Sequence, residues 1–213
     1  MINKIKLRGG TGNTPITVSV KERECNAPPK PFSATLYSYG DKKIYFNSQR
    51  FMRIEENRQN VAEVAMLESV HELMHTTPLL VIHNPPVIIE GSPKPIASQH
   101  GLVMYAEVKD GIPCSDITYW DQQEEAVVED ATIDLMQRIG VSNEYSGYME
   151  YVNNYRSKVL SIPGLSRQQL LERQQSSDVM GLFQLIGNAV IGGDNIQSDQ
   201  IAVGANLMIS IAN

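Results

Sequence analysis

The strongest constraint on the fold is a change of hydrophobic period near residue 55. Before it, residues 16–20 alternate as a half-buried strand does, and two short segments flank Gly40-Asp41-Lys42, a sequence typical of a hairpin turn. From about 55 to 77, apolar residues recur at three- and four-residue steps, which predicts one long amphipathic helix. Pro78 ends this helix, because proline cannot continue the hydrogen-bond ladder.

We therefore predict an α+β fold, in which a small N-terminal mixed or antiparallel sheet packs on this helix and a mostly helical C-terminal half follows. The domain prediction is a core of residues 1–140 and a helical C-terminal subdomain of residues 141–213 packed on it. Between Pro78 and Trp120 we expect ordered loop with short strands, or a partial helix around 101–108. Helical spacing, caps and breakers predict the later helices 121–139, 144–160 and 166–175, the last with Ser166 as N-cap. The apolar runs 181–191 and 201–211 are interpreted as buried helices or a subunit contact.

Composition excludes several classes of protein. The chain has 213 residues and a net charge of -6, which opposes a general affinity for nucleic acid. The apolar runs after Val179 fall short of the ~20 residues of a bilayer span, and no signal peptide is evident, so we expect a cytoplasmic protein. Cys25 and Cys114 are interpreted as ordinary packing residues.

The sequence His71-Glu72-Leu73-Met74-His75 lies at the end of the long helix. Two histidines four residues apart project from one helix face, so both imidazoles can bind one metal ion. Glu72 lies about 100° around the helix from His71, a position from which a carboxylate can reach water at the metal. Catalytic zinc takes three protein ligands, so this H-E-x-x-H motif predicts a zinc site that needs a third.

The third ligand has several candidates. His83 and His100 are possible loop ligands, but the helix containing Glu124-Glu125 and Glu129 is the stronger source. Glu125 and Glu129 are four residues apart and share a face, so one can bind metal while the other accepts a hydrogen bond from a ligand histidine. Glu124 is an alternative to Glu125, because it lies closer to the apolar face.

The order of these elements resembles the zincin metallopeptidases of the gluzincin type. The resemblance covers about residues 40–140: strand 43–47, the long helix ending in H-E-x-x-H, and a second helix carrying E-x-x-x-E. It implies a zincin-like catalytic core in which His71, His75 and Glu125 ligate zinc, Glu72 is the general base and Glu129 is a second-shell carboxylate. It also implies that strand 43–47 is the edge strand of the cleft, along which an extended peptide would bind.

The leading hypothesis is a zinc-dependent metallopeptidase acting on a peptide or protein substrate, with Tyr119, Tyr105 or His100 as the oxyanion donor. Of these three we predict Tyr119. One alternative is a catalytically silent zincin-like binding or assembly protein that forms homo-oligomers through its apolar residues 179–213. A further alternative is a metal-dependent hydrolase of a non-peptide amide.

Overall fold

The computed structural model describes the strand segments 5–8, 15–21, 35–38, 43–47 and 112–113, and residues 61–88, 94–109, 118–141, 148–192 and 197–212. The contacts of the chain define two compact units: Met1–Thr77 with Thr132–Gly147, and Pro78–Ala131 with Tyr148–Asn213. The predicted α+β class is confirmed. The domain boundary at residue 140 stays a prediction, and both cysteines lie outside the described residues.

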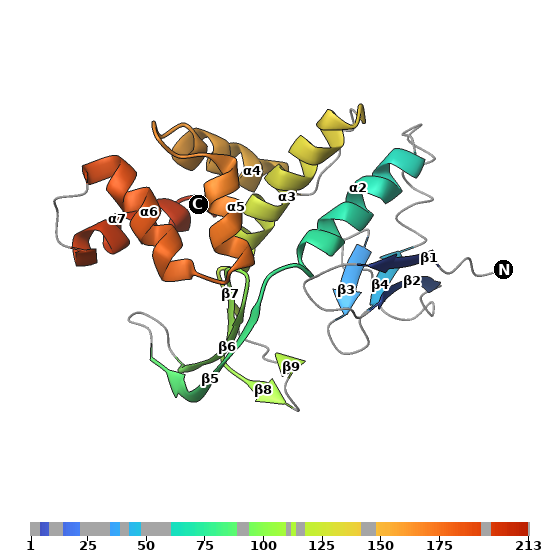
Figure 1. Cartoon of the computed structure of the whole chain (residues 1–213), viewed down its shortest axis with the longest axis horizontal. Helices are drawn as coiled ribbons and strands as arrows, with labels where there is room; N and C mark the ends of the chain where they lie inside the picture. Colours follow the sequence, from blue (N-terminus) through green and yellow to red (C-terminus); the bar gives the residue numbers. More distant parts are fainter. Residues whose placement is uncertain are drawn as a thin grey trace. The chain divides into compact units, whose positions relative to one another are not determined.

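The first unit contains a four-stranded mixed sheet in the order β1-β2-β4-β3 (Figure 1). Its strands are β1 (Ile5–Arg8), β2 (Pro15–Lys21), β3 (Thr35–Ser38) and β4 (Lys43–Asn47). The predicted hairpin is confirmed as the antiparallel pair β3 and β4. The prediction that strand 43–47 is an edge strand is wrong, because β4 also pairs in parallel with β2 and is therefore interior.

Helix α2 (Val61–Met74) contacts β3 and carries His71 in its last turn, and His75 follows directly after its end. The predicted start near residue 55 lies outside the described residues. Val64 and Leu67 are buried, and the apolar face continues to the buried side chain of His71. Beyond Met74 the backbone N–H of His75 still donates to the carbonyl of His71 at 3.3 Å, so His75 belongs to the same turn.

The second unit begins with an antiparallel sheet in the order β10-β7-β6-β5, with β8 and β9 as a separate pair. The short strands expected after Pro78 are confirmed, and residues 103–105 form a strand rather than part of a helix. The six strands are β5 (Leu80–Val87), β6 (Ile96–His100), β7 (Val103–Tyr105), β8 (Val108–Lys109), β9 (Ile112–Pro113) and β10 (Thr118–Tyr119).

Helices form most of the remaining chain (Figure 1). Ser166 caps α5 as predicted, with a reciprocal capping box to Gln169. The predicted helix 144–160 is confirmed from residue 149 as α4 followed directly by a short π-helix, and residues 144–147 lie outside the described residues. The helices are α3 (Asp121–Arg138), α4 (Met149–Tyr155), η1 (Arg156–Leu160), α5 (Arg167–Gln175), α6 (Val179–Ile191) and α7 (Gln197–Ile209).

The core of the second unit combines β6, β7, the start of α3 and the C-terminal helices. Many apolar side chains after Val179 are used in this core. Within α3, Val127, Val128 and Ala131 are buried, whereas Leu135 is 40% exposed and Ile139, just after the helix, is 58% exposed, so the apolar side of the helix does not continue to its C-terminus. Among the described residues, no helix has the length and apolarity needed to cross a bilayer.

Candidate metal centre

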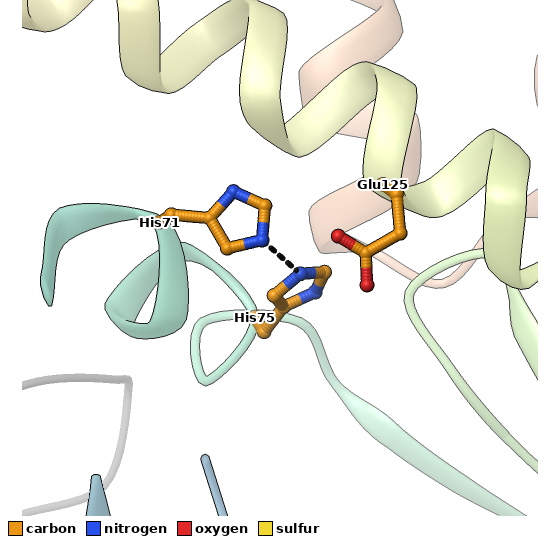
Figure 2. A group of neighbouring side chains, drawn as sticks. All are labelled: His71, His75 and Glu125. Atoms are coloured by element: carbon orange, nitrogen blue, oxygen red, sulfur yellow. Dashed lines mark hydrogen bonds between the residues drawn. The ribbon is translucent and has the colours of Figure 1, made fainter. Parts of the chain in front are cut away.

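The last turn of α2 brings two imidazoles together. His71 and His75 are one turn apart, and their Nε2 atoms lie 3.0 Å from each other (Figure 2). The two rings meet edge to face, with centroids 4.7 Å apart and an interplanar angle of 74°. Both nitrogens can therefore face one cation, since zinc binds imidazole nitrogen at about 2.0–2.1 Å.

Glu125 completes a three-residue group with these histidines. One ligand atom from each of His71, His75 and Glu125 lies within 4.8 Å of the others, and Figure 2 shows the Glu125 carboxylate beside the imidazoles. This is the single such group of His, Cys, Asp and Glu ligands within the part of the chain that the structure describes. Two imidazole nitrogens and one carboxylate oxygen match a donor set that zinc accepts, so the group can bind a metal ion.

The other candidates for the third ligand stand outside this group. His83 lies on β5 and His100 is buried on β6. Glu124 is buried as well, and its carboxylate is used elsewhere, because Oε2 accepts a hydrogen bond from the backbone N–H of Leu102 at 2.7 Å. The assignment of Glu125 as third ligand stays a prediction that this grouping favours.

The remaining predicted site residues are all at least partly buried. Glu72 is 8% exposed on α2, and Glu129 is 2% exposed on α3. Tyr119, at the end of β10, packs against the core, and its hydroxyl is buried with no hydrogen-bond partner among the described residues. A surface position for this hydroxyl is therefore excluded. The roles of Glu72, Glu129 and Tyr119 stay predictions.

Sequence analysis missed a buried charge cluster around Asp130. Its carboxylate is inaccessible to solvent and accepts hydrogen bonds from Arg156 and Arg167. The sequence indicated that Asp130 is on a helix, but nothing in it indicated partners from η1 and α5. Such pairings depend on how helices pack, so no local sequence signal identifies them.

We found no match to this chain among protein-family models, curated proteins or solved structures.

Proposed function

We propose that this protein is a zinc-dependent hydrolase, and specifically a metallopeptidase that cleaves peptide bonds. One observation carries the proposal: the Nε2 atoms of His71 and His75 lie 3.0 Å apart, in a group completed by Glu125. This contact is a hydrogen bond, in which one of the two Nε2 atoms carries a proton, and a cation that displaces this proton would meet two lone pairs. A helix bearing H-E-x-x-H adds a carboxylate next to the first ligand, as metal-assisted hydrolysis requires.

A bound zinc ion would supply Lewis acidity, polarising a substrate carbonyl and lowering the pKa of water. The chain's own residues would move the protons. Glu72 takes a proton from the attacking water and delivers it to the leaving amine, so that one carboxylate serves first as base and then as acid. Its burial supports this role, because a carboxylate shielded from bulk water exchanges protons with the substrate rather than with solvent.

Two further residues take supporting parts in this proposal. Glu129 lies one helical turn after Glu125 and is buried, so its carboxylate is suited to orient a ligand histidine. Tyr119 offers a buried hydroxyl without a described partner, which is suited to donate to a developing oxyanion.

The test compares Glu72→Gln with wild type in metal content and in hydrolysis of an unstructured protein such as casein. We expect the variant to keep stoichiometric zinc and lose at least about a hundredfold in turnover, because the amide cannot accept the proton. Glu63→Gln, on the same helix, is the matched control and should keep both properties. Wild-type protein that binds no zinc would overturn the proposal, and unchanged activity in Glu72→Gln would reject Glu72 as the base.

A second candidate function is a non-catalytic assembly protein. Met180 and Ile191 are 48% and 36% exposed, and they lie about three turns apart on the same face of α6. Exposed apolar side chains at both ends of this helix favour association with another copy of the chain, although Gln184 and Asn188 lie between them. A stable oligomer that dissociates in Met180→Lys, together with zinc-loaded protein that hydrolyses no peptide, would support this candidate over the first.

A further inference from the structure

The carboxylate of Glu124 connects three segments of the second unit. It lies in the first turn of α3 and is 1% exposed. Oε2 accepts the backbone N–H of Leu102 at 2.7 Å, and Oε1 accepts the side-chain amide of Gln174, on α5, at 2.6 Å. Gly101 makes room for it: a Cβ there would lie 2.6 Å from Oε1, and the residue has φ +62. The fit requires glycine at this turn.

Glu124 binds the turn at Gly101 and Leu102 from one side, and Ser177 binds the same turn from the other side. The hydroxyl of Ser177 accepts the N–H of Gly101 at 2.8 Å and donates to the carbonyl of Leu79 at 2.5 Å. Gln99 strengthens the same link, because its amide donates to the carbonyls of both Gly101 and Ser177. A continuous series of polar contacts, buried except at Leu79, thus runs from Leu79, which follows His75 closely in sequence, to Glu124, which precedes Glu125.

Ser177 occupies an unusual backbone conformation for this purpose. Its φ is +54, a left-handed conformation that costs a residue other than glycine, asparagine or aspartate of order 1 kcal/mol or more. The residue at this strained position is serine, and its hydroxyl makes the two hydrogen bonds to Gly101 and Leu79. Glycine would adopt this backbone without strain but would lose the hydroxyl.

We infer that Glu124 is a positioning residue for the metal ligand Glu125, an inference that rests on the function proposed above. Neighbouring residues of a helix point about 100° apart, so fixing the direction of one side chain fixes the direction of the next. The two hydrogen bonds to Glu124 therefore set the rotation of the first turn of α3 about its axis. The side chain of Glu125 is therefore already oriented before zinc binds, so zinc binding loses less side-chain entropy.

The experiment measures zinc affinity, by competition with a chromogenic chelator, and the visible absorption of the cobalt-substituted protein. Glu124→Ala removes both acceptors, and we expect its zinc dissociation constant to rise about 10- to 100-fold with a changed cobalt spectrum. The zinc dissociation constant of Glu124→Gln should stay below the roughly 10-fold rise that marks loss of a supporting partner. Its amide can still accept from Leu102 and can donate to Oε1 of Gln174, which has no hydrogen-bond partner among the described residues.

Gln123→Ala is the matched control for loss of a buried polar contact. Gln123 is the preceding residue of α3, is 7% exposed, and donates to the carbonyl of Met208 at 3.1 Å. We expect it to lower thermal stability without changing zinc affinity or the cobalt spectrum. An equal loss of affinity in Gln123→Ala and Glu124→Ala would overturn the inference, since general destabilisation would then explain both.

The outcomes separate this inference from the proposed function. Wild-type protein without zinc rejects the metal site and the inference together. Wild-type affinity in Glu124→Ala rejects only the inference, while equal loss in Glu124→Gln and Glu124→Ala would show that Glu124 is itself the ligand. If Glu124→Ala does not fold, Gln174→Leu replaces it, because it removes one donor to the same carboxylate. An unchanged zinc affinity in Gln174→Leu would then overturn the inference.

Discussion

Arg156 donates from Nε to Oδ1 of Asp130 at 2.5 Å, and the accepting side chain is completely buried. Arg167 donates to the other carboxylate oxygen, so one aspartate joins α3 to η1 and α5. We predict that Asp130→Ala lowers the free energy of unfolding by about 2–4 kcal/mol in chemical denaturation. The two arginine side chains are 35% and 33% exposed, so water can solvate them in part, which keeps the loss below that of a fully buried pair.

Asp134→Ala is the control for this prediction. Asp134 pairs with Arg138 one turn along the same helix, where the arginine side chain is 72% exposed. We expect a loss below about 1 kcal/mol, because solvent screens exposed pairs. Similar losses in the two variants would contradict a special role for the buried cluster.

Helices α6 and α7 approach each other at two glycines. A Cβ at Gly204 would lie 1.9 Å from the carbonyl oxygen of Phe183, and one at Gly187 would lie 1.9 Å from that of Gln200. Alanine in place of a helical glycine ordinarily stabilises by about 1 kcal/mol. We predict the opposite for Gly204→Ala, a loss of about 3 kcal/mol or more, because the helices must separate. Asn206→Ala, at an exposed position of α7, should change stability by less than about 0.5 kcal/mol.

Tyr155 should make stability depend on pH in the alkaline range. Burial, followed by the negative charge of Asp130, raises the pKa of Tyr155 far above its ordinary range, although Arg167 opposes the shift. The unfolded tyrosine ionises near pH 10, whereas the folded one stays neutral there. Its contribution is therefore complete below about pH 10 and falls above it, by up to about 1.4 kcal/mol per pH unit.

Denaturation of wild type and Tyr155→Phe across pH 8–11 tests this expectation. The difference in unfolding free energy should stay constant up to about pH 10 and then shift in favour of the variant. At pH 8 the variant should be at least as stable as wild type, because the lost hydroxyl has no hydrogen-bond partner among the described residues. Parallel pH profiles would show that Tyr155 ionises as readily in the folded protein.

Metal removal should lower stability through the His71, His75 and Glu125 group. Zinc at about a hundred times its dissociation constant adds about 2.7 kcal/mol to the free energy of unfolding. We expect zinc to raise the melting temperature of untagged wild type and of Glu72→Gln, and EDTA to reverse the rise. His75→Ala and Glu125→Ala should show no zinc-dependent rise. The same rise in His75→Ala would place the metal elsewhere.

Local signals predicted much of the fold, and particular residues show why. The predicted range 121–139 matches α3 to within one residue, and Ser166 caps α5 as predicted, because such signals act through the nearest backbone groups. The interior position of β4 and the roles of Asp130 and Ser177 were missed. Each depends on partners distant in sequence: β2 for β4, Arg156 and Arg167 for Asp130, and Gly101 and Leu79 for Ser177.

The sequence by itself determined the pairing of His71 with His75, since residues four apart on a helix share a face whatever the helix packs against. It left Glu124 and Glu125 as alternatives, because each is a carboxylate on the same helix and spacing alone does not say which way the helix is turned. The tertiary structure gives the carboxylates of Glu124 and Glu125 different neighbours. Leu102 and Gln174 bind the carboxylate of Glu124, and Glu125 groups with the two histidines.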